Sequence, residues 1–456
     1  MSGTTSRRWY YIIAAVVVVL AVVIGAALWW NQRNAWDVAD PAPLPAPTPV
    51  LHAAQSDGPA PDPATVTDAL AGPAADPALG KLSGQVTDAA TGDVLWTADQ
   101  DRMLVPASST KLVTATAALL TLAPDDRVGT QVLRGAEPGQ VVLKGNGDVT
   151  LQRSPGTGFF TDAASISDLA AQASAALGGE KVTSVVVDNS FRQGDLFNST
   201  WDGADIAAGN VAALGAVMVD AGRLDPSQNY SPRSATPAAD AGRDLAAALG
   251  VPDVPVSASD RAVATAGEDA TLGSVESAPL STRLRDMMQH SDNLLAESVA
   301  REVAAARGAE PTFAGASEAT LAALTEAGID VSGAVLKDNS GMSADNRLSA
   351  HILDDIVTAA AGDGDHAAAL RPLLDTLPVA AADGSLVDRY GADSGARAGA
   401  GWVRAKTGTL DGVNALAGTV TTDSGRVLTF GFLSNGSDMD AGRAALDRLT
   451  AALRGL

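Results

Sequence analysis

Two residues near position 110 carry side chains that could together do nucleophilic chemistry. Ser108 is followed three positions later by Lys111, at the start of a run rich in Ala, Leu and Thr. Residues three apart share one face of a helix, so the amine would lie within hydrogen-bonding distance of the hydroxyl. A serine needs a base beside it, and a lysine serves as that base only when desolvation lowers its pKa. Taken alone, however, the pair is better explained by Ser108 as a helix N-cap.

Two further polar groups change that interpretation. Ser291, Asp292 and Asn293 interrupt a helical pattern between His290 and Leu294. Residues 406–409, Lys-Thr-Gly-Thr, stand at the end of a predicted strand. A solvated turn would explain the first group alone, and an edge strand the second. Together, however, the groups would bring a second hydroxyl, an amide and a second ammonium to Ser108.

The elements that must position these groups are strands at the two ends of the chain and helices between them. A β-hairpin is predicted where residues 85–88 and 94–96 flank Ala-Thr-Gly-Asp. Residues 111–122 predict a helix that is apolar nearly all round and therefore buried. Towards the C-terminus we expect strands at 403–410, 414–421 and 426–434, and then an amphipathic helix at 439–453.

The middle of the chain alternates short strands with helices. A strand is predicted at 182–187, helices at 168–177 and 240–249, and a longer helical stretch at 280–305. Early and late strands can share one antiparallel sheet only if residues 124–275 form an inserted lobe. The predicted fold is therefore α+β. Its catalytic domain comprises residues 81–123 and 276–456, interrupted by the inserted lobe, 124–275.

The N-terminal segment predicts export. Residues 9–30 carry no charge and follow Arg7 and Arg8, and as a helix of about 33 Å they would cross the hydrocarbon core. Aromatic residues at both ends suit the two membrane interfaces. A cleaved signal peptide is the alternative, since residues 25–27 are small. We expect a short cytoplasmic tail, 1–8, and a single-pass membrane protein with an extracytoplasmic domain, or a secreted protein if the segment is cleaved.

Residues 31–80 predict a linker. Prolines recur through the stretch, interleaved with Ala and Asp, and no helical or strand period is visible. Such a composition is typical of a semi-extended, polyproline-like spacer. It would hold the working domain away from the membrane.

Composition excludes several classes of function. The net charge of −22 argues against a nucleic-acid partner, because a phosphate backbone would be repelled. The absence of cysteine removes disulfides, thiolate catalysis and Cys-based zinc sites. The four histidines show no paired ligand spacing, so neither a metal nor another cofactor is expected.

With its three polar groups in this order, the sequence resembles the penicillin-recognising serine enzymes with Ser-x-x-Lys, Ser-x-Asn and Lys-Thr-Gly motifs. More narrowly, it resembles the D-alanyl-D-alanine carboxypeptidase/endopeptidase family, the low-molecular-mass class C penicillin-binding proteins. The resemblance covers about residues 82–455. It rests on the stretches 105–115, 287–297 and 404–410, with weaker echoes at 145–148, 338–341, 377–379 and 383–385.

Two departures from the family pattern limit which family features are expected in this chain. The 183 positions from Ser108 to Ser291 are few for this family, so one subdomain of the insertion is expected to be reduced or missing. Asn339 stands where the family more often has Gly. No catalytic role is therefore expected for residues 338–341.

The resemblance implies a mechanism. Ser108 would attack the carbonyl between two D-alanines, and Lys111 would take its proton. Ser291 would relay a proton to the leaving amine, while the charge of Lys406 keeps Lys111 neutral. The backbone N–H groups of Ser108 and Thr409 would form the oxyanion hole.

The same resemblance implies the substrate contacts. Lys406, Thr407 and Thr409, with Gly408 between the threonines, would receive the C-terminal carboxylate, and Asn293 the penultimate amide. The expected partners are peptidoglycan peptides ending in D-Ala-D-Ala and β-lactam antibiotics, which would label Ser108 covalently. Whether the enzyme removes a terminal D-alanine or also cuts cross-links stays open.

Two alternatives have the same motifs. A β-lactamase would share the fold and hydrolyse the acyl-enzyme rapidly, and a catalytically silent protein would only bind the cell wall. An α/β-hydrolase is disfavoured, because no Gly-x-Ser-x-Gly elbow is evident.

Overall fold

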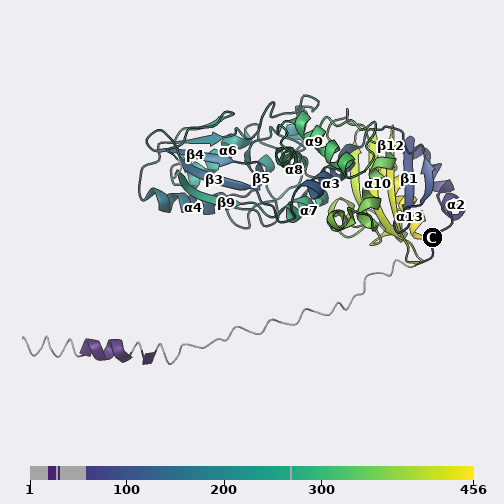
Figure 1. Ribbon diagram of the computed structural model, residues 1–456, viewed down its shortest axis with the longest axis horizontal. Helices are drawn as coiled ribbons and strands as arrows, with labels where there is room; N and C mark the ends of the chain where they lie inside the picture. The colour runs from purple at the N-terminus through teal and green to yellow at the C-terminus, as the bar shows by residue number, and fades with distance from the viewer. Residues whose placement is uncertain (1–18, 27–28, 31–57, 268–269) are drawn as a thin grey trace, which may run out of the picture. The chain divides into compact units, whose positions relative to one another are not determined.

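The computed structural model describes residues 19–26, 29–30, 58–267 and 270–456 (Figure 1). The chain divides into a short unit, Met1–Ala53, and one compact unit, Ala54–Leu456. Residues 19–26 and 29–30 are helical, and the rest of the segment predicted at 9–30 lies outside the described residues, as do the tail 1–8 and residues 31–57. Among the residues that are described, no helix is both long and apolar enough to span a membrane.

One antiparallel sheet combines strands from both ends of the compact unit. Its order is β10-β11-β12-β1-β2. The strands are β1 (Lys81–Asp88), β2 (Val94–Ala98), β10 (Val403–Leu410), β11 (Val413–Thr421) and β12 (Val427–Asn435). Strand β1 pairs with β12 from Lys81 opposite Asn435 to Asp88 opposite Leu428. The predicted pairing of early and late strands in one antiparallel sheet is therefore confirmed.

Helices cover both faces of this sheet. On one face, α13 (Met439–Arg454) packs over Phe430 and Phe432, whose rings stack 5.2 Å apart. On the other face lies α10 (Ala350–Ala361), which can approach closely because Gly431 has no side chain to meet the Ala350 carbonyl. Successive residues of a strand point to opposite faces, so β12 is buried almost throughout.

The prediction of a linker over residues 31–80 is wrong from Pro63 onward. Residues Pro63–Ala74 form helix α2, and Pro77–Leu79 form a 3₁₀ turn, η1. Both begin with a proline directly after a capping aspartate, the position where a proline favours a helix rather than breaking it. The side chains of Val66 and Leu70 are fully buried in the core beneath α13. Proline content alone therefore misidentified a folded element as spacer.

A cluster of helices lies between the sheet and the rest of the unit (Figure 1). At its centre α3 (Thr110–Thr121) is buried on nearly every residue, as its apolar sequence predicted. The predicted helical stretch 280–305 is two helices, broken at residues 290–292. The surrounding helices are α7 (Leu280–Gln289), α8 (Asn293–Ala306), α9 (Phe313–Glu326), α11 (Ala367–Leu370) and α12 (Pro372–Thr376).

A second sheet uses only residues between Gly129 and Glu276. Its order is β8-β6-β4-β3-β9, with β3 antiparallel to both neighbours and β6 parallel to both of its own. Its strands are β3 (Gly129–Arg134), β4 (Gln140–Gly145), β6 (Ser184–Asp188), β8 (Val256–Ser259) and β9 (Thr271–Glu276). Helices α4 (Ile166–Leu177) and α6 (Pro237–Ala248) share its core, where the sequence predicted helices. The remaining elements of this region are β5 (Asp148–Leu151), β7 (Val217–Val219), α5 (Ala204–Ala207) and a 3₁₀ turn, η3 (Asp220–Gly222).

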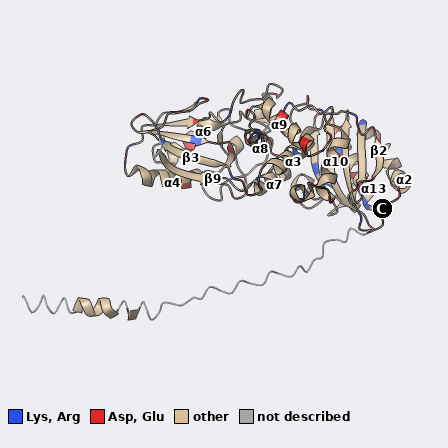
Figure 2. Ribbon diagram, in the orientation of Figure 1, with Lys and Arg blue, Asp and Glu red and all other residues tan. Residues whose placement is uncertain are grey.

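Acidic and basic residues occur throughout the compact unit (Figure 2). Some form ion pairs, such as Arg426 with Asp88, whose Nε and Oδ2 atoms are 2.8 Å apart.

Candidate active site

Ser108 lies in a tight turn between the sheet and α3. The 3₁₀ turn η2 (Ala107–Ser109) precedes α3, and Ala107 adopts a positive φ of 48°. The hydroxyl groups of Ser109 and Thr110 are buried and donate to the carbonyls of Pro106 and Ala107, at 2.7 and 2.9 Å. Ser108 is partly exposed, and neither η2 nor α3 has a side-chain cap. The N-cap explanation for Ser108 is therefore wrong.

The amine of Lys111 meets three oxygen atoms. Its Nζ atom lies 3.1 Å from Ser108 Oγ, 2.6 Å from Asn293 Oδ1 and 2.6 Å from the Ser340 carbonyl oxygen. A neutral amine has two N–H bonds and one lone pair. If the two short contacts use the N–H bonds, the lone pair is directed at the Ser108 hydroxyl. This arrangement suits a general base.

Burial favours the neutral form of Lys111. The side chain is fully buried, which lowers its pKa to about 8, while the carboxylates of Asp338, Asp292 and Glu297 act in the opposite direction. Lys406 is also fully buried, and its pKa is lowered well below the usual value by burial and then by Lys111. Burial is thus the main reason why Lys111 loses its proton easily, and a contribution from the charge of Lys406 stays a prediction.

Ser291 occupies the break between α7 and α8. It has a positive φ of 55°, and its Oγ atom accepts a hydrogen bond from Lys406 Nζ at 2.9 Å. The same amine also donates to the Thr407 carbonyl at 2.8 Å. The third residue of the group, Asn293, donates from Nδ2 to the Asn210 carbonyl at 3.0 Å, in addition to its contact with Lys111.

Asp292 anchors this break to the region of the second sheet. Its Oδ2 atom lies 2.8 Å from Arg223 and 3.2 Å from Arg233, and all three side chains are buried. Its Oδ1 atom caps α8 by accepting from the Leu295 N–H at 2.8 Å. Burial alone would raise the pKa of Asp292, but the two guanidinium groups hold it well below the usual range. The buried ion pairs therefore fix the backbone that carries Ser291 and Asn293.

Strand β10 approaches the Ser108 turn at Gly408. A Cβ atom at this position would lie 2.6 Å from the Pro106 carbonyl oxygen and 3.0 Å from the Ser109 nitrogen, so glycine is required. Thr407 and Thr409, on either side of Gly408, line the same groove as Ser108. The hydroxyl of Thr407 lies 2.7 Å from that of Ser385.

The groove that holds Ser108 has a volume of about 1050 Å³. It opens between the Ser291 break, the end of β10 and the first turns of α13. Its lining includes Ser108, Ser291, Thr407, Thr409, Ser385, His290, Arg389, Tyr390 and Arg443. The structure thus brings the three sequence groups together: Ser108 with Lys111 and Asn293, and Ser291 with Lys406. Both residues predicted to supply the oxyanion hole, Ser108 and Thr409, line the groove.

The loop 338–341, for which no role was expected, lies against the nucleophile turn. Its Ser340 carbonyl accepts from Lys111, and Gly341, with a φ of 83°, has no room for a Cβ atom against the Ala107 carbonyl. The Asp338 carboxylate accepts from the N–H groups of Gly341 at 2.9 Å and Ser343 at 2.7 Å. The weak resemblance at 338–341 pointed to this loop, but the contact itself could not be predicted from residue types, because it uses a backbone carbonyl that every residue has.

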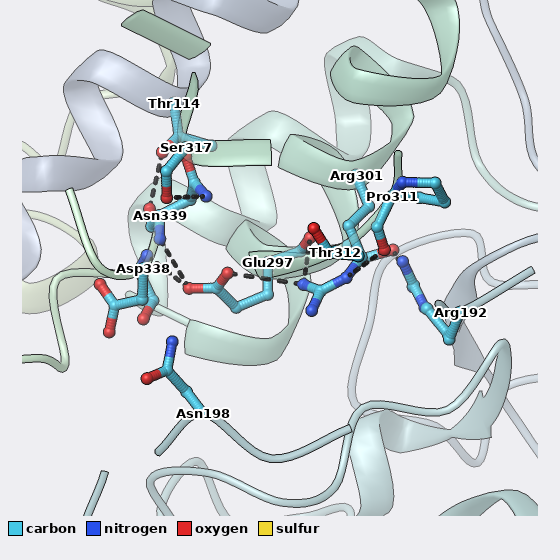
Figure 3. A network of polar contacts seen from close by, with 12 residues as sticks. Thr114, Arg192, Asn198, Glu297, Arg301, Pro311, Thr312, Ser317, Asp338 and Asn339 are labelled. Atoms are coloured by element: carbon cyan, nitrogen blue, oxygen red, sulfur yellow. Dashed lines mark hydrogen bonds and ion pairs between the residues drawn. The ribbon is translucent and has the colours of Figure 1, made fainter. Parts of the chain in front are cut away.

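Glu297 holds the same loop from the α8 side (Figure 3). Its Oε1 atom accepts from the N–H groups of both Asn339 and Ser340, each at 2.8 Å. Its other oxygen lies 3.6 Å from the guanidinium of Arg301, which also sits over the Phe313 ring. Burial raises the pKa of Glu297 to about 7, and Asp338 adds to this, while Arg301 opposes it.

In the described part of the chain, no cluster of three or more His, Cys, Asp or Glu side chains could hold a metal ion. The groups that the structure brings to Ser108 are hydroxyls, amines, an amide and backbone groups, with buried carboxylates behind them. Such a set can activate a serine, stabilise an oxyanion and transfer protons, which is the chemistry of acyl transfer.

Comparison with known proteins agrees with this chemistry. The sequence matches the "D-Ala-D-Ala carboxypeptidase 3 (S13) family" over residues 66–232 and 227–454. It is 49% identical to carboxypeptidase DacB of Mycolicibacterium smegmatis over 379 residues, 82% of this chain and 81% of that protein. It is 46% identical to a carboxypeptidase of Mycobacterium tuberculosis over 380 residues, 82% of this chain and 80% of that protein.

Among solved structures, the fold resembles penicillin binding protein 4 (DacB) from Haemophilus influenzae. The TM-score is 0.65 at 20% sequence identity, covering 86% of this chain and 98% of that one. The same protein complexed with a novel β-lactam gives a TM-score of 0.61, again at 20% identity, covering 85% and 98%. At this identity the likeness concerns the fold.

Proposed function

Since the chain belongs to the D-Ala-D-Ala carboxypeptidase 3 (S13) family, we propose that it forms an acyl-enzyme on Ser108. It is a serine-type D-Ala-D-Ala carboxypeptidase, as its relatives at 46–49% identity are carboxypeptidases. The observation that carries the residue assignment is the contact of 3.1 Å between Lys111 Nζ and Ser108 Oγ, with the other two contacts of the amine made to Asn293 and Ser340.

In the acylation step, Ser108 Oγ bonds to the carbonyl carbon of the penultimate D-alanine, and its proton passes to Lys111. The developing oxyanion receives hydrogen bonds from the backbone N–H groups of Ser108 and Thr409. The C–N bond then breaks, and the amine of the terminal D-alanine takes the proton that Lys111 had accepted, passed on through Ser291, which leaves Lys111 neutral. The hydrogen bond from Lys406 orients the Ser291 hydroxyl for this transfer.

In the deacylation step, water attacks the ester and Ser108 recovers its proton. Lys111 again serves as the base, since it already lies next to the ester oxygen. Asn293 fits a positioning role best, because its amide oxygen binds Lys111 and its nitrogen binds the Asn210 carbonyl. The second N–H of the Asn293 amide has only a weak contact with Met342 Sδ, at 3.7 Å, and would meet the penultimate amide of the substrate.

The substrate class follows from the family and from the groove. Peptidoglycan stem peptides ending in D-Ala-D-Ala present a scissile amide next to a free carboxylate. Thr407 and Thr409 offer hydroxyl groups to that carboxylate, beside the nucleophile. A β-lactam ring mimics the same amide, and the Haemophilus influenzae protein of this fold has been solved with a β-lactam. We therefore expect β-lactams to acylate Ser108.

The test uses labelled penicillin and a pentapeptide ending in D-Ala-D-Ala. Ser108→Ala should abolish both covalent labelling and release of D-alanine. Ser109→Ala is the matched control, because that hydroxyl is buried against Pro106 and should not be needed for labelling. Labelling of the Ser108→Ala variant would refute the assignment of the nucleophile.

Two further experiments separate a carboxypeptidase from a β-lactamase, and cleavage of a terminal D-alanine from cleavage of a cross-link. A β-lactamase would release the penicillin adduct rapidly, whereas a carboxypeptidase would keep it for many turnovers of peptide. Product analysis on cross-linked peptidoglycan fragments separates removal of a terminal D-alanine from cleavage of a cross-link.

We also propose that residues 9–30 anchor the enzyme in the cell membrane, with the compact unit on the extracytoplasmic side. The proposal rests on 22 consecutive uncharged residues behind an Arg pair, and on a substrate that lies outside the cytoplasm. A secreted enzyme, produced by cleavage near residues 25–27, is the alternative.

A further inference from the structure

Arg443 reaches the active-site groove from the first turns of α13. Its Nε atom donates a hydrogen bond to Thr409 Oγ1 at 3.2 Å, and both residues line the groove with Ser108. Thr409 directly follows Gly408, whose Cα lies against the Ser108 turn. Arg443 is therefore bonded to Thr409, and Thr409 is the neighbour of the glycine that packs against the Ser108 turn.

The hydrogen bond from Arg443 also determines what the Thr409 hydroxyl can do. Because the oxygen accepts from Nε, the hydroxyl proton stays available for an acceptor in the groove. The end of the guanidinium is open as well: the side chain is 38% exposed, and its Nη1 atom lies 3.9 Å from an Asp440 carboxylate that is itself 94% exposed. A guanidinium fork with free N–H groups is well suited to a carboxylate.

Other cations near the groove are already engaged. Lys406 is buried, donates to Ser291 and to a backbone carbonyl, and has its pKa lowered well below the usual value. It is therefore a weak source of fixed positive charge for a substrate. Arg389 makes two hydrogen bonds to the Asp447 carboxylate, at 3.0 and 2.6 Å. Arg443 has no such partner at close range among the residues that the structure describes.

We propose that Arg443 binds the C-terminal carboxylate of the substrate together with the Thr409 hydroxyl. This deepens the proposed function, on which it rests, by assigning the specificity for a free carboxylate to a residue outside the three sequence motifs. A carboxylate attached to the leaving amine would lie between the oxyanion position and α13. Arg443 would be a substrate-binding residue and take no part in proton transfer.

The experiment compares two activated peptidyl thioesters that differ only in their leaving group, which ends in a carboxylate in one and a carboxamide in the other. In Arg443→Gln, kcat/KM for the carboxylate substrate should fall on the order of tenfold to hundredfold, the usual effect of losing a charge-assisted hydrogen bond. The carboxamide substrate should change little. Arg448→Gln is the matched control, because Arg448 lies on the same helix but pairs with Asp76.

Three results would overturn the inference or its premise, and they can be told apart. Equal losses for both thioesters in Arg443→Gln would mean that the residue only supports Thr409 or the fold. No loss for either would mean that it does not meet the substrate. A wild-type enzyme that releases no D-alanine from the pentapeptide would instead refute the proposed function itself. Arg443→Lys, which keeps the charge without the fork, should recover only part of the preference.

Discussion

At the scale of single residues, the site depends on how many acceptors surround one amine. Asn293 and Ser340 take the two N–H bonds of a neutral Lys111, so its lone pair can face Ser108. The carboxylate of Glu297 acts through the backbone, since it holds the N–H group of the residue whose carbonyl binds Lys111. One buried carboxylate thus both places an acceptor and favours the protonated amine.

The acylation rate should depend on pH through Lys111. Its pKa is lowered to about 8, so the neutral, basic form grows as pH rises through that value. We expect the second-order rate constant for acylation by penicillin to rise from about pH 6 to about pH 9, with its midpoint near the pKa of Lys111, and to level off above. Glu297→Gln keeps an acceptor for the loop but removes a negative charge, and should move this rise to lower pH. A rate constant independent of pH across this interval would exclude Lys111 as the base.

At the scale of elements, two segments pass the Ser108 turn with no room for a Cβ atom, and a third carries Ser291 and Asn293 to the site. Strand β10 passes the turn at Gly408, and the loop 338–341 passes it at Gly341. The break between α7 and α8 is held from another side by the buried pairs of Asp292 with Arg223 and Arg233. The position of Ser108 therefore depends on backbone packing as much as on the start of α3.

Gly341→Ala should impair acylation beyond its effect on stability. Alanine at a φ of 83° costs about 1 kcal/mol, and its Cβ would overlap the Ala107 carbonyl and displace the nucleophile. We expect the acylation rate to fall on the order of 100-fold, as for a misplaced catalytic group. Gly328→Ala is the control: its φ is 77° but its surroundings are open, so it should lose only thermal stability. Equal acylation rates in both variants would contradict this view of the turn.

At the scale of the whole molecule, the first and last elements of the compact unit pack against each other. Strand β1 pairs with β12, and α2 packs under α13, so residues before and after the second-sheet region share one core. The compact unit therefore includes α2, which precedes its first strand. The segment predicted to anchor the enzyme precedes this unit.

Two truncations test this arrangement. A protein beginning at residue 58 should keep the unfolding temperature and penicillin acylation of the compact unit. It should stay in the soluble fraction, whereas we expect the full chain to fractionate with membranes. A protein beginning at residue 81 lacks α2, and losing buried Val66 and Leu70 should cost roughly several kcal/mol of unfolding free energy. Equal unfolding temperatures for the two would contradict the packing of α2. A full chain that stays in the soluble fraction would refute the anchor.

The sequence by itself predicted the three polar groups that meet at Ser108 and the pairing of early with late strands in one sheet. Hydroxyl and amine groups at helical spacing, as in Ser108 and Lys111, and the alternation of buried strands are local patterns, so they can be predicted from residue types. The tertiary structure decided what no local pattern encodes: the Ser340 carbonyl at Lys111, the Arg443 guanidinium at Thr409, and α2 in place of a linker. These contacts join residues far apart in the chain, or use backbone atoms that every residue has. Only the packing of the sheet, the helices and the loops brings them together.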